Sequence, residues 1–308
     1  MQPNPALRRL GYSPDDRLVI IHTDDIGMCH SSILAFSDLH AFGLISSGAV
    51  MVPCPWFLQA AQYAREHPDA DLGVHLTLTS EWPTYRWGPI STRELESGLI
   101  DEEGYFQRFT WPAMQHGKPA FVQREIEAQV ERAVAAGMQP THADTHMGVL
   151  GSEKFMAGYV KMALRKRLPL MLFRLDEAGW RAAGLNEHAA AQAAGLVQML
   201  DAECVPMLDA IRGLPLDQPD NRLDQAKAVF SSLQPGITHF IIHPSVDTPE
   251  LRAITPDWPS RMADYQTFLS AELKTYLRDI GMQVIGYREI QQIMPEPALA
   301  NSIIELLP

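Results

Sequence analysis

Residues 18–27 read Leu-Val-Ile-Ile-His-Thr-Asp-Asp-Ile-Gly. The first five residues form a short apolar, β-branched run, which is typical of a buried strand. Two adjacent carboxylates, Asp24 and Asp25, follow this run, and Ile26 and Gly27 come after them. The stretch therefore predicts a strand of a parallel sheet with an acidic carboxyl end, provided that strands and helices alternate along the rest of the chain.

Strand and helix patterns do alternate outward from this stretch. Helices are expected at residues 31–42, 56–66, 122–136, 153–167, 186–200, 222–233 and 262–280. Further strands are expected at residues 44–52, 72–78, 140–146, 170–174, 237–242 and 283–286. This alternation is typical of a parallel sheet with crossover helices. We predict one α/β domain over residues 1–308, a (β/α) barrel of seven or eight strands or an irregular relative of one.

Residues 81–119 interrupt the alternation. Trp82, Trp87 and Trp111 lie there among several prolines and glycines, and hydrophobic periodicity is weak. A long irregular segment inside a compact domain is usually functional when it is ordered. We expect an insertion that borders a binding groove; the alternative is that its tryptophans form a small core of their own.

The composition excludes several classes of protein. Of 308 residues, 25 are Lys or Arg and 37 are Asp or Glu, so the net charge of -12 argues against a surface for nucleic acid or anionic membrane. No run approaches the roughly 18 apolar residues of a membrane helix. The cysteines at 29, 54 and 204 match neither a disulfide framework nor a CxxC site. With no signal peptide at the N-terminus, we expect a reducing cytoplasm.

Ionisable side chains gather where the expected strands end. His75 lies on the third strand, His142, Asp144 and His146 alternate along the fourth, and His243 ends a later one. The strand ends of a (β/α) barrel meet at one mouth, where active sites lie. Residues 142, 144 and 146 share one face of a strand, and three ionisable groups on an inward face are costly unless they are paired or bind metal.

Two imidazoles and a carboxylate suit a first-row divalent ion, with zinc as the best match and magnesium or another divalent ion left open. For any one of these histidines, a hydrogen-bonded core position is the commoner alternative. Asp24 and Asp25 could instead cap a helix, but two adjacent carboxylates raise the pKa of one of them, which suits a general base. His243, with a pKa expected near 7, suits a proton donor; Asp247 as a purely structural partner is the alternative.

These residues lie in segments that resemble the motifs of one family. Residues 21–27 (IHTDDIG) resemble the N-A-D-D-F-G signature of the YdjC-like carbohydrate deacetylases, which include chitooligosaccharide and hopanoid-associated deacetylases. Residues 45–47 (ISS) resemble the V-T-S-T segment, and residues 73–79 (GVHLTLT) resemble G-L-H-L-N-L-T. Residues 140–146 (PTHADTH) resemble P-T-H-x-D-S-H, and residues 243–244 resemble a late T-H-P. The order and spacing hold over almost the whole chain.

The resemblance implies a (β/α) barrel related to the polysaccharide deacetylases, and removal of an N-acetyl group from a small carbohydrate by metal-activated water. Carried over residue by residue, it implies three ligands to one divalent ion: Asp25, His75 and His146. Asp24 would be the general base and His243 the general acid, while His142 and Asp144 would orient the ligands. Apart from the resemblance, the Trp-rich composition of the insertion leads us to expect that Trp82 and Trp87 pack on the apolar face of the sugar.

This sequence departs from the family pattern after the fourth strand. Gly148 and Leu150 stand where two further histidines are expected, so we expect a wider and less polar pocket there. One alternative is another metal-dependent hydrolase such as a phosphoesterase, which would need cations at the mouth. Arg174, after the strand at residues 170–174, is the candidate for that contact and for substrate binding. The other alternative is a non-catalytic sugar-binding protein; a homo-oligomer is compatible with either.

Overall fold

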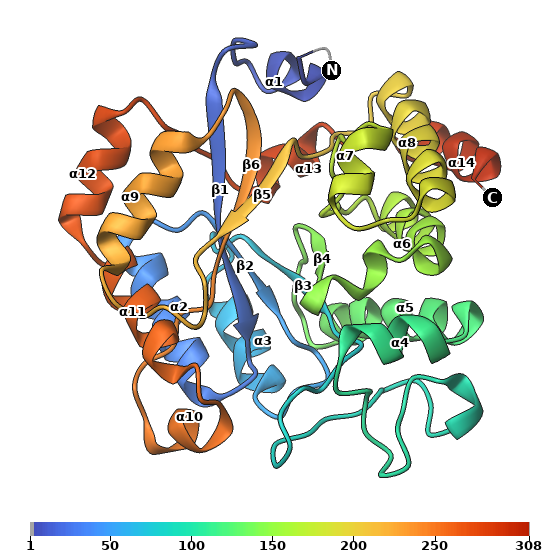
Figure 1. The fold of residues 1–308 in the computed structure, drawn as a ribbon, viewed down its shortest axis with the longest axis horizontal. Coiled ribbons are helices and arrows are strands. Elements are labelled where there is room, and N and C mark those ends of the chain that lie inside the picture. Colours follow the sequence, from blue (N-terminus) through green and yellow to red (C-terminus); the bar gives the residue numbers. More distant parts are fainter. Residues whose placement is uncertain (1–2, 308) are drawn as a thin grey trace.

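The computed structural model describes residues 3–307 and contains a sheet of seven strands. The strands are β1 (Arg17–Ile26), β2 (Ser47–Val50), β3 (Leu72–Leu76), β4 (Ala143–Thr145), β5 (Ala210–Gly213), β6 (Gly236–Ile242) and β7 (Gln283–Val284). Their order is β4-β3-β2-β1-β6-β5, with β7 paired to the first part of β1. All of these pairs are parallel, so the carboxyl ends of the strands lie at one end of the sheet (Figure 1).

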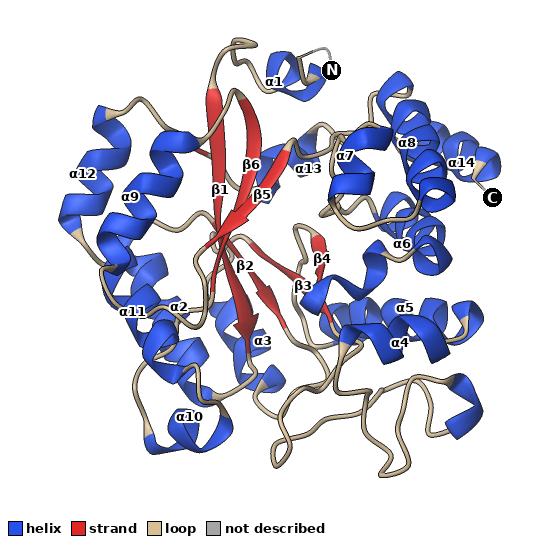
Figure 2. Ribbon diagram, in the orientation of Figure 1, coloured by secondary structure: helices blue, strands red, loops and turns tan. Residues whose placement is uncertain are grey.

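Helices surround the curved sheet, as Figure 2 shows. They are α1 (Pro5–Arg9), α2 (His30–Phe42), α3 (Phe57–Glu66), α4 (Thr110–His116), α5 (Pro119–Ala135), α6 (Glu153–Lys166), α7 (Glu177–Ala182), α8 (Glu187–Ala202), α9 (Arg222–Ser232), α10 (Pro249–Ile254), α11 (Trp258–Phe268), α12 (Ala271–Asp279), α13 (Tyr287–Gln292) and α14 (Pro297–Leu306). Two 3₁₀ turns, Leu95–Ser97 and His146–Gly151, complete the set. Within residues 3–307, none of the helices is both long and apolar enough to cross a bilayer.

The predicted (β/α) barrel is confirmed in an irregular form, because the ring between β4 and β5 is closed by single bridges rather than by a full strand. Ala143 in β4 pairs with Leu170, and Phe173 pairs with Leu208 just before β5, both in parallel. Residues 170–174, expected to form a strand, therefore make only these isolated bridges. The strand β5 was not expected from the sequence because its residues are mostly exposed and lack an apolar run.

The interior of the ring changes from apolar to polar along the strands. Leu18 and Ile20 of β1 pack with Ile237 of β6 and with Tyr287 at the amino end of the sheet. Val19 and Ile21, which alternate with them, belong instead to the large cluster that the helices cover. The next inward position on β1 is His22, which is fully buried, and Asp24 follows it. Inside the ring, the apolar residues at the amino ends of the strands are thus followed by a layer of polar residues toward the carboxyl ends.

The prediction of a single helix at residues 262–280 is wrong, because the chain forms two helices, α11 and α12, with a break at Leu269 and Ser270. The Ser270 side chain accepts the backbone N–H of Leu273 and caps α12. Ser in this position satisfies one of the free donors at a helix start and favours a new helix over a continuous one. Arg261 of α11 lines the cavity at the mouth of the barrel.

The insertion at residues 81–119 is ordered against the barrel. Trp87 and Phe106 are buried in the main core. The buried carboxylate of Glu125, in α5, accepts the backbone N–H groups of Ile90 and Ser91 at 3.1 and 2.9 Å. The carboxylate satisfies backbone N–H groups that have no partner in a helix or sheet, and so it holds this irregular segment in place. The insertion is thereby fixed close to the ends of β3 and β4.

Candidate active site

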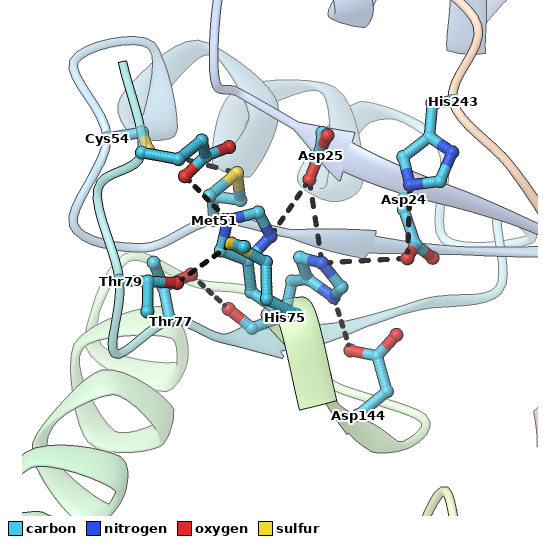
Figure 3. Close-up of polar contacts among 12 residues, drawn as sticks. Asp24, Asp25, Met51, Cys54, His75, Thr77, Thr79, Asp144 and His243 are labelled. Carbon is cyan, nitrogen blue, oxygen red and sulfur yellow. Dashed lines mark hydrogen bonds and ion pairs between the residues drawn. The ribbon is translucent and has the colours of Figure 1, made fainter. Parts of the chain in front are cut away.

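The ionisable residues expected at the strand ends do converge at the carboxyl end of the sheet. Asp24 and Asp25 lie at the end of β1, His75 lies on β3, and Asp144 lies on β4. His146 follows β4 directly and His243 follows β6 directly. Figure 3 shows the His75 ring with Asp24, Asp25 and Asp144 around it.

A β-bulge separates the two adjacent aspartates of β1. Between the pairs Thr23–Gly48 and Ile26–Val50, β1 advances by three residues while β2 advances by two. Asp25 has a φ of 61°, in the left-handed region that non-glycine residues rarely adopt. Such a bulge redirects a side chain at the end of a strand. Asp24 and Asp25 consequently face different neighbours although they are consecutive.

Asp25, His75 and His146 form a compact group that can hold a metal ion. One nitrogen or oxygen from each residue lies within 4.8 Å of the others. Asp25 Oδ1 is 3.2 Å from His146 Nδ1 and 3.6 Å from His75 Nε2. Asp25 Oδ1 and His75 Nε2 are buried and have no hydrogen-bond partner. Unpartnered buried polar atoms are rare in folded proteins, so this pair of atoms fits a cation between them.

Carboxylates hold the other nitrogen of each imidazole. His75 Nδ1 is 2.8 Å from Asp144 Oδ1, and His146 Nε2 is 3.1 Å from Glu81 Oε2. Carboxylate partners of this kind fix the orientation of metal-binding histidines. Burial alone would lower the pKa of His146, but Glu81 and Asp25 raise it to about 9. The sequence had indicated Asp144 for this role but not Glu81, which lies in the irregular insertion.

Arg261 of α11 holds Asp25 from the opposite side. Its guanidinium lies 2.8 Å from Asp25 Oδ2 and 2.8 Å from Asp257 Oδ1. Burial would raise the pKa of Asp25, but Arg261 and the two histidines outweigh burial and hold this pKa well below its ordinary value. Asp25 is therefore a carboxylate at neutral pH. Neither Arg261 nor Asp257 was expected from the sequence.

Asp24 lies between the group around Asp25 and His243. Asp24 Oδ2 is 3.7 Å from His75 Nε2 and 3.8 Å from His243 Nε2. Burial raises the pKa of Asp24 well above its ordinary value; the charge of His75 opposes this rise, and Asp144 and Asp25 add to it. A carboxylate with a raised pKa is a stronger base than an exposed one.

His243 differs from the sequence expectation in one respect. Burial lowers the pKa of His243 to about 4 rather than leaving it near 7, so its imidazole is neutral at neutral pH. Its backbone N–H donates to Asp264 Oδ2 at 3.0 Å, which fixes the chain after β6. Asp247, the alternative structural partner, binds Arg252 at 2.6 Å instead.

These groups open onto a cavity of about 410 Å³. It is lined by Asp24, Asp25, Glu81, Trp82, Thr145, His146, Met147, Gly148, Met171, Ile211, Leu216, Ile241, His243, Asp257 and Arg261. Gly148 lines this cavity next to Met147, whereas Leu150 is buried in the core. Of these two residues, only Gly148 therefore forms part of the cavity wall, and the wider and less polar pocket stays a prediction.

Three other residues indicated by the sequence lie elsewhere. Trp87 is buried, and its indole N–H donates to the Thr79 carbonyl at 2.9 Å. The His142 ring stacks on Tyr287, with ring centres 4.0 Å apart, below the cavity. Arg174 does not line the cavity, because its guanidinium forms ion pairs with Asp201 and Asp209 at 2.9 and 3.3 Å.

Comparisons with known proteins agree with the motifs. A sequence profile of the YdjC-like protein family matches residues 18–279. A carbohydrate deacetylase of Thermus thermophilus is 35% identical over 276 residues, which cover 89% of this chain and 94% of that protein. A carbohydrate deacetylase of Thermoanaerobacter pseudethanolicus is 22% identical over 271 residues, which cover 88% of this chain and 98% of that protein.

The fold also has a counterpart among solved structures. A protein of Enterococcus faecalis V583, provisionally named a cellobiose-phosphate cleavage protein, superposes with a TM-score of 0.71. The match covers 89% of this chain and 99% of that one, at 24% sequence identity. At this identity the likeness concerns the barrel architecture alone.

Proposed function

Because the chain belongs to the YdjC-like protein family, we propose that it is a carbohydrate deacetylase, a hydrolase that removes an N-acetyl group from an amino sugar or a short chitooligosaccharide. The observation that carries this proposal is the group formed by Asp25, His75 and His146, of which Asp25 and His146 line the cavity. Asp24 and His243 lie beside that group, as hydrolysis of an amide requires a base and an acid.

In this proposal Asp25, His75 and His146 would hold one divalent ion. One carboxylate and two neutral imidazoles, with room left for a further ligand, are typical of a catalytic zinc site; magnesium or another divalent ion is the alternative. When bound, such an ion polarises the acetyl carbonyl and makes water more acidic. Asp144, Glu81 and Arg261 would keep the three ligands in place, since each binds one of them.

Asp24 and His243 would move the protons. Asp24 takes a proton from the attacking water, and His243 donates one to the nitrogen of the departing amine. A neutral imidazole must first be protonated, so the proton reaches His243 during the reaction. Asp24 Oδ2 is 3.8 Å from His243 Nε2, and a small shift would let the proton pass between them.

The role of His243 can be tested by comparing two leaving groups. His243→Ala should lower kcat for an N-acetyl sugar by about 10²–10⁴, the usual contribution of acid–base catalysis. The loss should be much smaller for an aryl acetate, whose phenolate departs without a proton. We would measure kcat for both substrates and the melting temperature of the variant. Equal losses on both substrates would remove His243 from this role.

Trp82 and Trp87 should respond differently to substitution. Both rings are buried in the main core, but Trp82 also lines the cavity, with its ring 5.7 Å from the Arg261 guanidinium carbon, whereas Trp87 does not line it. We propose that Trp82 packs on the sugar, so Trp82→Ala should raise KM roughly 2- to 10-fold, the equivalent of about 0.5–1.5 kcal/mol for an aromatic contact. Trp87→Ala should instead lower the free energy of unfolding by about 3–5 kcal/mol. Steady-state kinetics and urea unfolding measure the two effects; a Trp82 variant with unchanged KM would contradict the contact.

The two alternatives are less well supported by the cavity. Among its lining residues, Arg261 is the one Lys or Arg, and Asp25 and Asp257 already bind it. A phosphoesterase needs cations that are available to the phosphate. A non-catalytic sugar-binding protein does not need an acid, a base and metal ligands together.

Release of acetate is the experiment that tests the function. The purified chain would be incubated with a panel of N-acetylated sugars of one to several units, with zinc, magnesium, cobalt or nickel or with chelator. We expect acetate release that depends on a divalent ion. No acetate from any sugar with any ion would overturn the proposal, and phosphate release from sugar phosphates would favour the phosphoesterase.

We also propose that the domain works in the cytoplasm, since Cys29, Cys54 and Cys204 are unpaired.

A further inference from the structure

A second buried group of ionisable residues lies deeper in the barrel. It consists of His22 of β1, His239 of β6, Asp144 of β4 and Asp24. His22 precedes Asp24 by two residues and His239 precedes His243 by four, so these rings face the same interior one layer farther from the mouth. One nitrogen or oxygen from each of the four residues lies within 4.8 Å of the others, and all four residues are buried.

The four inward atoms of this group have no hydrogen-bond partner outside the group. They are His22 Nε2, His239 Nε2, Asp24 Oδ1 and Asp144 Oδ2. The opposite atoms of two of these groups are in use, which fixes how the groups are turned. Asp144 Oδ1 contacts His75 Nδ1 at 2.8 Å, and His239 Nδ1 contacts the Tyr287 hydroxyl at 2.9 Å. Four residues that each bring a buried N or O atom within 4.8 Å of the others, with no partner outside the group for these atoms, fit a shared occupant.

The spacing of these atoms is that of ligands around one ion. His22 Nε2 is 3.0 Å from Asp144 Oδ2 and 3.3 Å from Asp24 Oδ1. In a tetrahedral site with bonds of about 2.0 Å, the ligand atoms are about 3.3 Å apart. We propose that His22, His239, Asp24 and Asp144 bind a second divalent ion of the zinc class. Two imidazoles and two carboxylates balance its charge in a place that excludes water.

The second ion would couple the two layers through Asp24. Asp24 Oδ1 faces the deeper group, while Oδ2 lies 3.8 Å from His243 Nε2 at the cavity. An ion on Oδ1 would hold the carboxylate so that Oδ2 stays at the cavity floor. His22 stands where the N-A-D-D-F-G signature quoted above has Asn. The inference does not depend on the proposed function, because it concerns the number of bound ions.

Metal stoichiometry tests this proposal directly. Apo-protein prepared with chelator would be titrated with zinc, desalted and measured by inductively coupled plasma mass spectrometry. We expect two zinc ions per chain for the wild type and one for His22→Asn, which introduces the residue of the family signature. His239→Gln should also bind one, and it replaces His22→Asn if circular dichroism shows that the latter does not fold.

A matched control comes from the same layer of the barrel. The His142 ring lies 5.0 Å from the His22 ring and is equally buried, but it is not among the four ligands. His142→Gln should therefore keep two ions. One ion per chain in the wild type, or two in folded His22→Asn and His239→Gln, would overturn the second site. Either result leaves acetate release, and so the proposed function, to be judged separately.

Discussion

Asp24→Asn is expected to lower kcat for an N-acetyl sugar by about 10²–10⁴ while at least one divalent ion per chain stays bound. The amide keeps the size of the carboxylate but cannot take a proton from water at neutral pH. Asp24 is well placed for that step, because burial raises its pKa and Oδ2 lies 3.7 Å from His75 Nε2 at the cavity floor. Acetate release and the metal content of the same preparation measure both parts of the prediction.

Asp247→Asn is the control for this substitution. Asp247 follows His243 by four residues, but its carboxylate binds Arg252 and does not line the cavity. Its activity should stay within about two-fold of the wild type, since substitutions away from the site usually change little. If Asp24→Asn keeps activity within a few-fold as well, another group is the base.

The sequence predicted best those site residues that share a strand with a clear pattern. His75 and Asp144 lie on short strands whose neighbours are buried, and Asp24 ends a run of apolar residues. His22 and His239 carried the same signal, because each lies an even number of residues before a predicted site residue and so shares its face. The alternation that indicated His142, Asp144 and His146 could have been extended to these two strands.

Other site residues could not be found from sequence because their positions depend on tertiary packing. Glu81 lies in the irregular insertion, where no periodicity shows which way a side chain points. Arg261 lies 236 residues after Asp25, on a helix where an arginine usually faces solvent. The break between α11 and α12 is visible in the sequence only as one capping residue, Ser270. The same limit explains Arg174, whose expected place at the mouth depended on a strand that proved irregular.

Burial also explains why the pKa of His243 differs from the value that the sequence predicts. The residue type alone predicts a pKa near 7, whereas the surroundings lower this value to about 4. Only 22% of the His243 side chain is exposed, and a buried imidazole loses the water that stabilises its charged form. Burial in the protein therefore changes the protonation state that the residue type alone predicts for His243.

Replacing both His75 and His146 by Ala should remove one divalent ion per chain and abolish measurable acetate release. Each ring presents one nitrogen to Asp25 Oδ1, so the double variant leaves only a single carboxylate at that position. Loss of an outer contact alone typically weakens metal binding 10- to 100-fold, so loss of either imidazole should cost at least ~10-fold. In the Ala variant, Asp144 and Glu81 each lose a hydrogen-bond partner. A second double variant, His75→Gln with His146→Gln, should be measured beside the Ala variant, because its amide groups keep polar atoms near these two carboxylates. Zinc titration with wild type and His142→Gln as references measures the difference; a double variant that binds as many ions as the wild type would show that Asp25, His75 and His146 do not form a metal site.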